Sequence, residues 1–137
     1  MTLTHVVFFQ VQSGQQKVQR IVEVAKQSFR NRERLLFFVD DEKAFMFLDD
    51  ALWKHPQASF LPHGTDPKDL IAITTEKRNI NNARIAFNLS STPLLVEGPF
   101  KTIYDFEDVS SKAKEGLAAA RYDAYKRLGL SIEAVRS

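Results

Sequence analysis

Short apolar runs alternate with segments of helical periodicity along the first half of the chain. Residues 3–12 and 34–39 are rich in β-branched and aromatic side chains, and continuous runs of this kind are typical of strands buried on both faces. Residues 15–30, and the segment that opens at residues 40–42 and ends near Trp53, instead place apolar side chains at helical spacing. This strand–helix–strand–helix order predicts an α/β fold with parallel strands and right-handed crossovers.

The second half of the chain continues the pattern with short strands and one long helix. Asp108 is expected to cap this helix and Gly129 to end it, because an aspartate accepts from free backbone N–H groups and glycine adopts the conformation of a helix end. No repeat, linker or low-complexity segment interrupts the sequence, so a single domain is expected over residues 1–137. The expected segments are a loop over 56–69, strands over 70–74, 84–89 and 100–106, a helix over 108–128, and a stretch over 130–137 that packs back or frays.

The composition excludes several classes of protein. The chain has 137 residues and no cysteine, which excludes disulfides, thiolate metal sites and a cysteine nucleophile and fits a cytoplasmic location. The N-terminal segment lacks the basic leader of a signal peptide, and no apolar stretch approaches the ~18 residues of a membrane span. The net charge of +2 is too small to predict strong direct binding to nucleic acid.

An alternating α/β chain raises the question of a nucleotide site. A dinucleotide site needs several glycines after the first strand, so that the backbone can approach the pyrophosphate closely. This chain has only Gly14 there, and the phosphate-binding loop G-x-x-x-x-G-K-[ST] does not occur. Asp40 follows the second strand, where an acid could bind a ribose, but the same position favours a helix cap. A small α/β nucleotide-binding domain or enzyme therefore remains only the alternative interpretation.

Catalytic and metal-binding patterns are weak. Asp40, Asp41 and Glu42 could suggest a magnesium site, but three consecutive acids at a strand-to-helix turn do not converge on one point, so capping is favoured. The histidines form no metal-binding pair, and no serine lies in a G-x-S-x-G turn. We expect no catalytic residue, no metal and no cofactor. The histidines are His5, His55 and His63.

Residues 48–64 combine the only tryptophan with a proline-containing loop. Trp53 stands at the expected end of a helix, and Phe60 and Pro62 follow in the loop. These rings either pack on each other beside the core or form a partly exposed patch. Exposed aromatic patches are typical anchors for a protein partner, because rigid rings bury much area at a low entropy cost. The segment therefore predicts a partner-binding surface, with core packing as the alternative.

The last long helix carries a second candidate surface. Lys114 and Arg121 are two turns apart and share a helix face, with Leu117 between them. Tyr122 and Tyr125 add aromatic surface. Such a face could hold an acidic peptide with a hydrophobic tip, while the alternative is a solvated helix face whose cations lie along apolar surface.

These segments resemble the chi subunit family of bacterial DNA polymerase III. The resemblance lies in the run from Leu48 to Trp53 with its following Pro, Ser-Phe and Pro-His, in Asp41-Glu42-Lys43, and in Arg121-Tyr122-x-Ala124-Tyr125-Lys126. The order of elements agrees over nearly the whole chain. The sequence departs from the family where the last helix has a lysine and an arginine one turn apart, since these positions hold Glu115 and Ala119.

The resemblance implies a three-layer α/β/α Rossmann-like domain with a mostly parallel sheet, no bound nucleotide and no catalysis. It implies that Trp53, Phe60 and Pro62 dock the psi subunit of the clamp loader or an equivalent partner, a surface that an accessory helicase can also occupy. It further implies that the last helix receives the acidic, Phe-terminated tail of single-stranded DNA-binding protein. The matching or nearby residues for the tail are Lys114, Arg121, Tyr122 and Tyr125.

A third interpretation is direct nucleic-acid binding. Lys77, Arg78 and Arg84 could contact a phosphate backbone, and such binding would weaken steeply with salt. The small net charge makes it the weakest interpretation. An adaptor in DNA replication, without enzymatic activity, is the function that the sequence favours.

Overall fold

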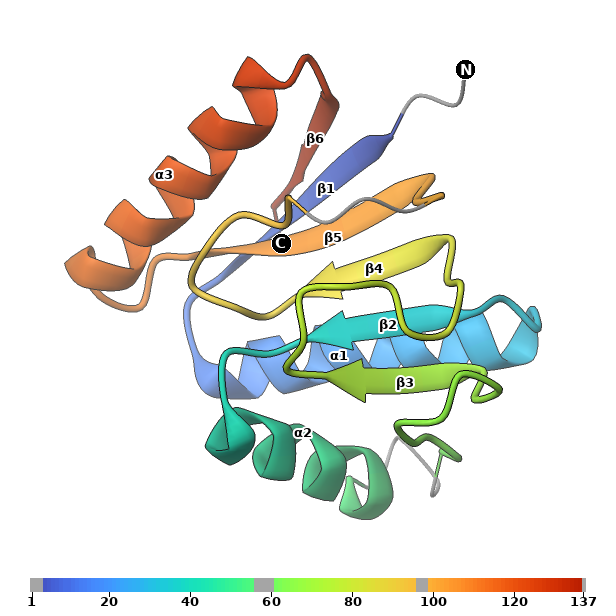
Figure 1. Ribbon diagram of the computed structural model, residues 1–137. Helices are drawn as coiled ribbons and strands as arrows, with labels where there is room; N and C mark the ends of the chain where they lie inside the picture. The colour runs from blue at the N-terminus through green and yellow to red at the C-terminus, as the bar shows by residue number, and fades with distance from the viewer. Residues whose placement is uncertain (1–3, 56–60, 96–98, 137) are drawn as a thin grey trace.

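The computed structural model describes residues 4–55, 61–95 and 99–136, which form a six-stranded parallel sheet and three helices. The strand order is β3-β2-β4-β5-β1-β6 (Figure 1). The predicted α/β fold is confirmed, and the sheet is entirely parallel. The elements are β1 (His5–Val11), α1 (Gly14–Arg30), β2 (Leu35–Phe38), α2 (Glu42–Lys54), β3 (Ile71–Thr74), β4 (Ile85–Asn88), β5 (Thr102–Asp108), α3 (Lys112–Arg127) and β6 (Ser131–Val135).

Each helix begins at a side chain that accepts a hydrogen bond from a free backbone N–H group. Ser13, Asp41 and Ser111 each accept from the N–H three residues later, at the starts of α1, α2 and α3. The prediction that Asp108 caps the last helix is wrong. Strand β5 continues as far as Asp108, and α3 begins only at Lys112.

The C-terminal segment forms an edge strand. Gly129 has φ +75°, a conformation that favours glycine, and it ends α3 as predicted. The chain then turns and pairs β6 with β1 in parallel, from Ser131 opposite His5 to Val135 opposite Phe9. Of the two outcomes that the sequence left open, packing back is therefore the one observed.

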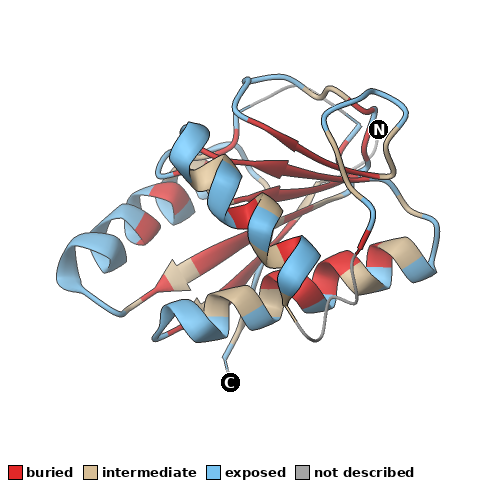
Figure 2. Ribbon diagram, turned by 90° about the horizontal axis from the view of Figure 1, so that it is seen from below, coloured by how far each residue is buried: buried red, intermediate tan, exposed pale blue. Residues whose placement is uncertain are grey.

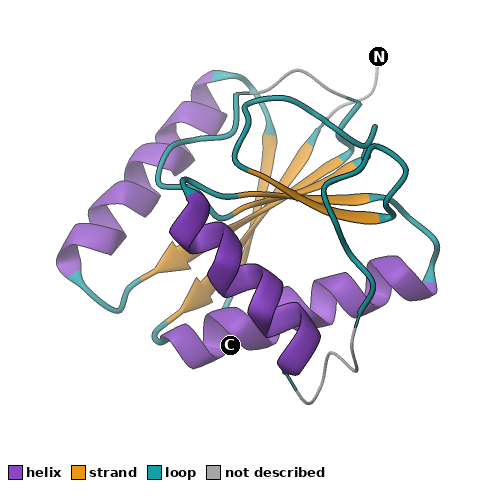
Figure 3. Cartoon of the chain, turned by 60° about the horizontal axis from the view of Figure 1, so that its bottom comes forward, coloured by secondary structure: helices purple, strands orange, loops and turns teal. Residues whose placement is uncertain are grey.

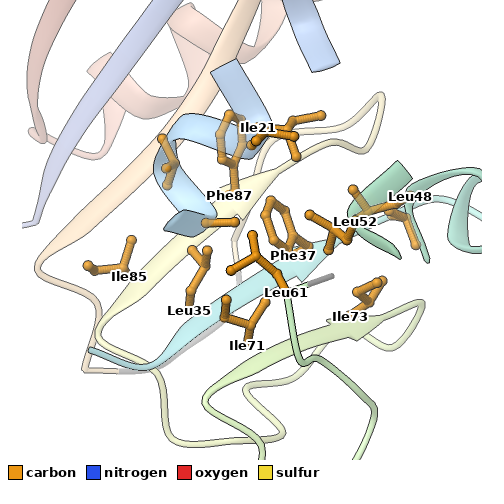
Figure 4. Packing of buried hydrophobic residues seen from close by; sticks show 14 of the residues in the cluster. Ile21, Leu35, Phe37, Leu48, Leu52, Leu61, Ile71, Ile73, Ile85 and Phe87 are labelled. Carbon is orange, nitrogen blue, oxygen red and sulfur yellow. The ribbon is translucent and has the colours of Figure 1, made fainter. Parts of the chain in front are cut away.

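Helices α1 and α2 cover one face of the sheet. Because successive side chains of a strand point to opposite faces, Leu35 and Phe37 of β2 enter this core while Leu36 and Phe38 enter the other. Figure 4 shows Phe37 beside Leu52 of α2 and Phe87 near Ile21 of α1, with isoleucines of the neighbouring strands around them. Both aromatic rings are completely buried.

Helix α3 and two long loops cover the opposite face, so the structure has three layers. Tyr125 of α3 is completely buried there, while Ala83 and Phe100 enter the same core from the loops before β4 and β5. Figure 3 shows these loops against the strands that α3 does not cover on this face. Figure 2 shows that buried positions take only part of each helix surface, whereas β2, β3 and β4 are buried along their whole length.

The carboxyl ends of the strands and the starts of the helices gather at one edge of the sheet. Strands β1, β2 and β5 each lead directly into a helix, and β4 leads into the loop that begins at Leu89. In parallel α/β proteins this edge forms a crevice, because the chain leaves the sheet toward opposite faces.

Candidate functional site

Trp53 lies at the end of α2, and its side chain is partly exposed. The residue is 39% exposed, and its ring lies over the ring of His63, with 4.6 Å between the ring centroids. Pro62 is exposed in the same region, while Phe60 falls outside the described residues. The structure therefore brings Trp53 next to the segment that contains Pro62, and part of the indole remains available to a partner.

His63 is the buried support of the Trp53 ring. Its side chain is 1% exposed, its Nδ1 lies 2.7 Å from the carbonyl oxygen of Leu61, and its Nε2 lies 2.7 Å from Oδ1 of Asp49. Two short hydrogen bonds hold the imidazole in one orientation, and the indole rests on a fixed surface.

Two further apolar side chains of α2 are exposed, and the sequence reasoning missed both. Met46 is 64% exposed and Phe47 is 63% exposed. The sequence feature that could have predicted this exposure is the run Phe45-Met46-Phe47-Leu48. Consecutive helix residues point in different directions, so these four apolar side chains cannot all face the core. Only Leu48 of this run is fully buried.

Two of the four residues predicted for tail binding are exposed on α3. The side chain of Lys114 is 58% exposed, and Tyr122 is 39% exposed with its ring 5.7 Å from that of Phe8. Glu115 and Ala119, where the sequence departs from the family, are also exposed. Lys114 and Tyr122 are thus available to a peptide.

The other two residues, Arg121 and Tyr125, face the sheet instead. The Arg121 side chain is 8% exposed, its Nε lies 3.1 Å from Oδ1 of Asp105, and its Nη2 donates to the carbonyl of Phe106 at 2.8 Å. The Tyr125 hydroxyl donates to Oδ2 of Asp105 at 2.9 Å and accepts from Asn88 at 3.0 Å. Both residues were expected to supply peptide-binding surface. Their side chains instead belong to a buried network that attaches α3 to β4 and β5.

Burial sets the electrostatics of this network. Desolvation raises the pKa of the Asp105 carboxyl to about 6, although the charge of Arg121 and hydrogen bonds from Tyr125, Phe106 and Asn88 lower it. Burial and the charge of Asp105 raise the pKa of the Tyr125 hydroxyl above its ordinary range. Asp105 and Asn88 are partners that sequence reasoning missed, since nothing in their local sequence marks them as contacts of α3.

A cavity of about 570 Å³ opens at the carboxyl edge of the sheet, between α1, α2 and α3. Its interior wall is apolar, with Ile21, Leu48 and Phe106 among the lining residues. Lys114 and Arg121 line it from α3, so these two predicted residues share a cavity that Tyr122 and Tyr125 do not line.

Asp108 joins the start of α1 to the end of β5. Its Oδ2 lies 2.8 Å from Nζ of Lys17 and 4.0 Å from Nζ of Lys114, and its side chain is 6% exposed. Burial acts against ionisation, but hydrogen bonds from Lys17 and Ser110 outweigh it and lower the pKa of Asp108 to about 2.

Replacing Asp108 with asparagine should lower the free energy of unfolding by about 2 kcal/mol at pH 7, because the pKa is depressed by nearly two units. A depressed pKa stabilises the fold above the unfolded value of 3.8 and ceases to do so as the pH falls toward 2. Denaturant unfolding at several pH values should therefore show the deficit shrinking between about pH 4 and pH 2. Asp123→Asn, at an exposed position of α3, is the control; a deficit that does not change with pH would contradict the assignment.

The three acidic residues that follow β2 have different contacts. Asp41 caps α2, with its Oδ1 2.9 Å from the backbone nitrogen of Ala44. Asp40 accepts from the N–H of Ser91 at 3.0 Å and so joins the end of β2 to the loop after β4. Glu42 is exposed in the first turn, where a negative charge suits the helix dipole. The capping interpretation is confirmed for Asp41.

The remaining candidate residues make ordinary surface contacts. His5 Nε2 lies 3.1 Å from Oε2 of Glu133, across the pair β1–β6. Lys77 donates to a threonine hydroxyl, Arg78 pairs with a neighbouring glutamate, and Arg84 is exposed. Within the described ranges no cluster of three metal-ligating side chains occurs, and no helix has the length and apolar character to cross a membrane.

Comparison with known proteins identifies the family. The family model described as DNA polymerase III chi subunit, HolC, matches residues 3–133. DNA polymerase III subunit chi of Escherichia coli strain K12 is 30% identical over 120 residues, which cover 83% of this chain and 81% of the relative. The family match begins before β1 and ends within β6, so it includes both the Trp53 region and α3. The chain belongs to the DNA polymerase III chi subunit family, and its role is that of an accessory subunit in DNA replication.

Proposed function

We propose that this protein is a non-catalytic adaptor of the DNA polymerase III holoenzyme, which links the clamp loader to the tail of single-stranded DNA-binding protein. The observation that carries the proposal is the placement of two exposed aromatic side chains on opposite layers. Trp53 belongs to α2 on one face of the sheet, and Tyr122 belongs to α3 on the other. A protein with two such separate surfaces can hold two partners at once without their competing.

The Trp53 surface is the proposed site for the clamp-loader partner, which is the psi subunit or an equivalent protein. An accessory helicase could use the same surface in its place. A tryptophan that is supported from below and exposed above is suited to this role, because the ring is already ordered before the partner binds. Pro62 adds rigid apolar area beside it, and Phe60 remains a predicted contact.

The α3 surface is the proposed site for the acidic, Phe-terminated tail. Lys114 would pair with a carboxylate of the tail, and Tyr122 would add apolar contact area, since both are exposed. Arg121 and Tyr125 act indirectly in this proposal, because their bonds to Asp105 fix the orientation of α3. The four predicted residues thus divide into two contact residues and two positioning residues.

The experiment that tests the tail site is a titration of the protein with a fluorescent peptide copied from the host's single-stranded DNA-binding protein tail. Lys114→Ala and Tyr122→Ala should each weaken binding by about three- to tenfold, and binding should fall with added salt. A peptide without its terminal phenylalanine should bind more weakly. Lys68→Ala, an exposed lysine before β3, should leave the affinity unchanged.

The negative outcome is equally informative. Failure of the wild-type protein to bind the peptide at high micromolar concentration would remove the tail-binding half of the proposal. Equal weakening by Lys68→Ala would show that the attraction follows overall charge rather than the α3 surface. Either result would leave the Trp53 surface as the site to be tested.

A further inference from the structure

Three neighbouring strands of the sheet are each preceded by a cation. The first residues of β2, β4 and β5 lie opposite one another in the register, and the residues before them are Arg34, Arg84 and Lys101. The N–H of Lys101 donates to the carbonyl of Arg84 at 2.8 Å, and neighbouring strands are about 4.8 Å apart, so the three residues form a row. The row lies at the amino edge of the sheet, opposite the cavity. Lys77 and Arg78, which sequence reasoning grouped with Arg84, instead follow the carboxyl end of β3.

The end of α1 adds two more cations beside this row. Arg30 and Arg32 are exposed, and Figure 1 shows the end of α1 next to the start of β2. Glu33 follows them, and its Oε2 lies 2.8 Å from Nζ of Lys101, so the end of α1 reaches the start of β5. Arg30 also suits the negative end of the helix dipole, but that field does not account for Arg84 and Lys101, which precede strands. We call five residues the basic edge: Arg30, Arg32, Arg34, Arg84 and Lys101.

Most cations of the basic edge have no acidic partner. Arg30 and Arg84 are exposed, and in the described part of the chain their side chains have no hydrogen-bond or ion-pair partner. Arg32 lies over an aromatic ring, 5.5 Å from its centroid. Arg34 donates to two backbone carbonyls at 2.8 and 3.0 Å, and these neutral acceptors fix its position without cancelling its charge.

Carboxylates are fewer than cations along this part of the amino edge. Among the described residues from the end of α1 onward that precede β2, β3, β4 and β5, six cations face three carboxylates. The sixth cation is Lys68, and the carboxylates are Glu33, Asp66 and Asp69. Asp66 and Asp69 lie in the loop before β3 and accept from backbone N–H groups of that loop. The cavity at the carboxyl edge is lined by equal numbers of both signs, so the positive excess belongs to the amino edge.

A small polar hollow of about 150 Å³ lies between the end of α1 and the starts of β4 and β5. Its lining includes Lys101, together with Gln27, Asn31 and Thr102, whose side chains make no hydrogen bond to any residue that the structure describes. Amide and hydroxyl groups beside arginine and lysine are the groups with which proteins contact the phosphates of DNA. Glu33 also lines the hollow and opposes an anion there, so its removal should favour one.

We propose that the basic edge binds the phosphate backbone of duplex DNA without reading its sequence. The cations supply the attraction, and the polar side chains of the hollow donate to phosphate oxygens. A duplex fits better than a single strand, because proteins that bind single strands stack the bases on aromatic rings, and the described residues of the basic edge and the hollow expose none. An accessory subunit in DNA replication works beside such a duplex. This contact goes beyond the adaptor proposal and uses neither Trp53 nor α3.

The test is a titration of a short fluorescent duplex with the full chain, followed by anisotropy at low salt and then over a salt series. The wild type should bind with a Kd on the order of 10 µM at low salt. Arg84→Gln and Arg30→Gln should each weaken binding by about threefold and reduce the slope of log affinity against log salt by about one. Glu33→Gln should strengthen binding by about threefold, because it frees Lys101 for a phosphate.

Two matched controls make the same changes of charge at the opposite edge. Lys43→Gln and Glu42→Gln alter exposed residues at the start of α2. Both should bind within about 1.5-fold of the wild type, because salt screens charges that lie far from the bound DNA. Thermal unfolding should show that all five variants are folded.

Four outcomes would overturn the proposal. The first is a wild type that binds no duplex at high micromolar concentration. The second is equal weakening by Arg84→Gln and Lys43→Gln, which would show that binding follows overall charge. The third is tighter binding to a single strand of the same length, and the fourth is equal competition by a polyglutamate of the same charge. The tail peptide and the clamp loader take no part in this experiment, so the adaptor proposal stands or fails separately.

Discussion

Replacing Arg121 with methionine is expected to lower the free energy of unfolding by about 3–5 kcal/mol at pH 7, the usual cost of removing one partner of a buried ion pair. Arg121 is 8% exposed and Asp105 is 1% exposed, so water cannot replace the lost cation. The change also removes the donor to the carbonyl of Phe106, which lies 2.8 Å from Nη2. Denaturant unfolding of the variant and the wild type measures the difference.

The loss should depend on pH in a defined direction. Burial already raises the folded-state pKa of Asp105 from 3.8 to about 6, and removing Arg121 would raise it further. An acid with a raised pKa contributes most stability below its unfolded value, and that contribution is lost as the pH rises through the folded value. The variant therefore loses more stability than the wild type on this rise, and its deficit should be smallest near about pH 4.

A double variant tests the cause of this behaviour. The double variant, Arg121→Met with Asp105→Asn, has no buried carboxylate at this position. Above about pH 6 the stability deficit of the single variant relative to the wild type should grow, whereas that of the double variant should not. If the single variant instead shows the same deficit at pH 4 and pH 7, Asp105 does not depend on Arg121 for its charge. The role assigned to the pair in attaching α3 would then be wrong.

The sheet and the first two helices were predictable from local sequence. The run 34–39 contains only apolar residues after its first position, and both faces of β2 are indeed covered. The long segment after Gly14 shows its apolar residues at helical spacing, and the residues it buries are apolar except for Ser28. These patterns are easy to recognise because the residues that a strand or helix buries against its neighbours lie within one short segment of the sequence.

The orientation of α3 was not predictable in the same way. Its many alanines give a weak contrast between inner and outer sides, so the sequence could not tell that Arg121 and Tyr125 point inward. Their burial depends on Asp105 and Asn88, which belong to β5 and β4 and reach α3 only through the tertiary fold. An arginine in a helix is usually solvated, and only a distant acidic partner makes its burial favourable.

Replacing Trp53 with alanine is expected to weaken binding to the host's clamp loader by at least about thirtyfold, which corresponds to about 2 kcal/mol. The ring offers exposed apolar area that is already ordered, because it lies on His63 and that ring is held by Asp49 and Leu61. Binding of the purified clamp loader to immobilised protein, measured by biolayer interferometry, gives the affinity of each variant.

The control for Trp53 is an exposed apolar side chain on the other layer. Leu128, at the end of α3, is 58% exposed, so Leu128→Ala removes apolar surface without touching α2. Trp53→Phe should retain part of the affinity, since a smaller ring still packs on His63. Because Trp53 is 39% exposed, its replacement by alanine should change the free energy of unfolding by only about 1 kcal/mol, so a loss of binding would not reflect unfolding. Unchanged clamp-loader affinity in Trp53→Ala, or an equal loss in Leu128→Ala, would mean that the partner does not dock at the end of α2.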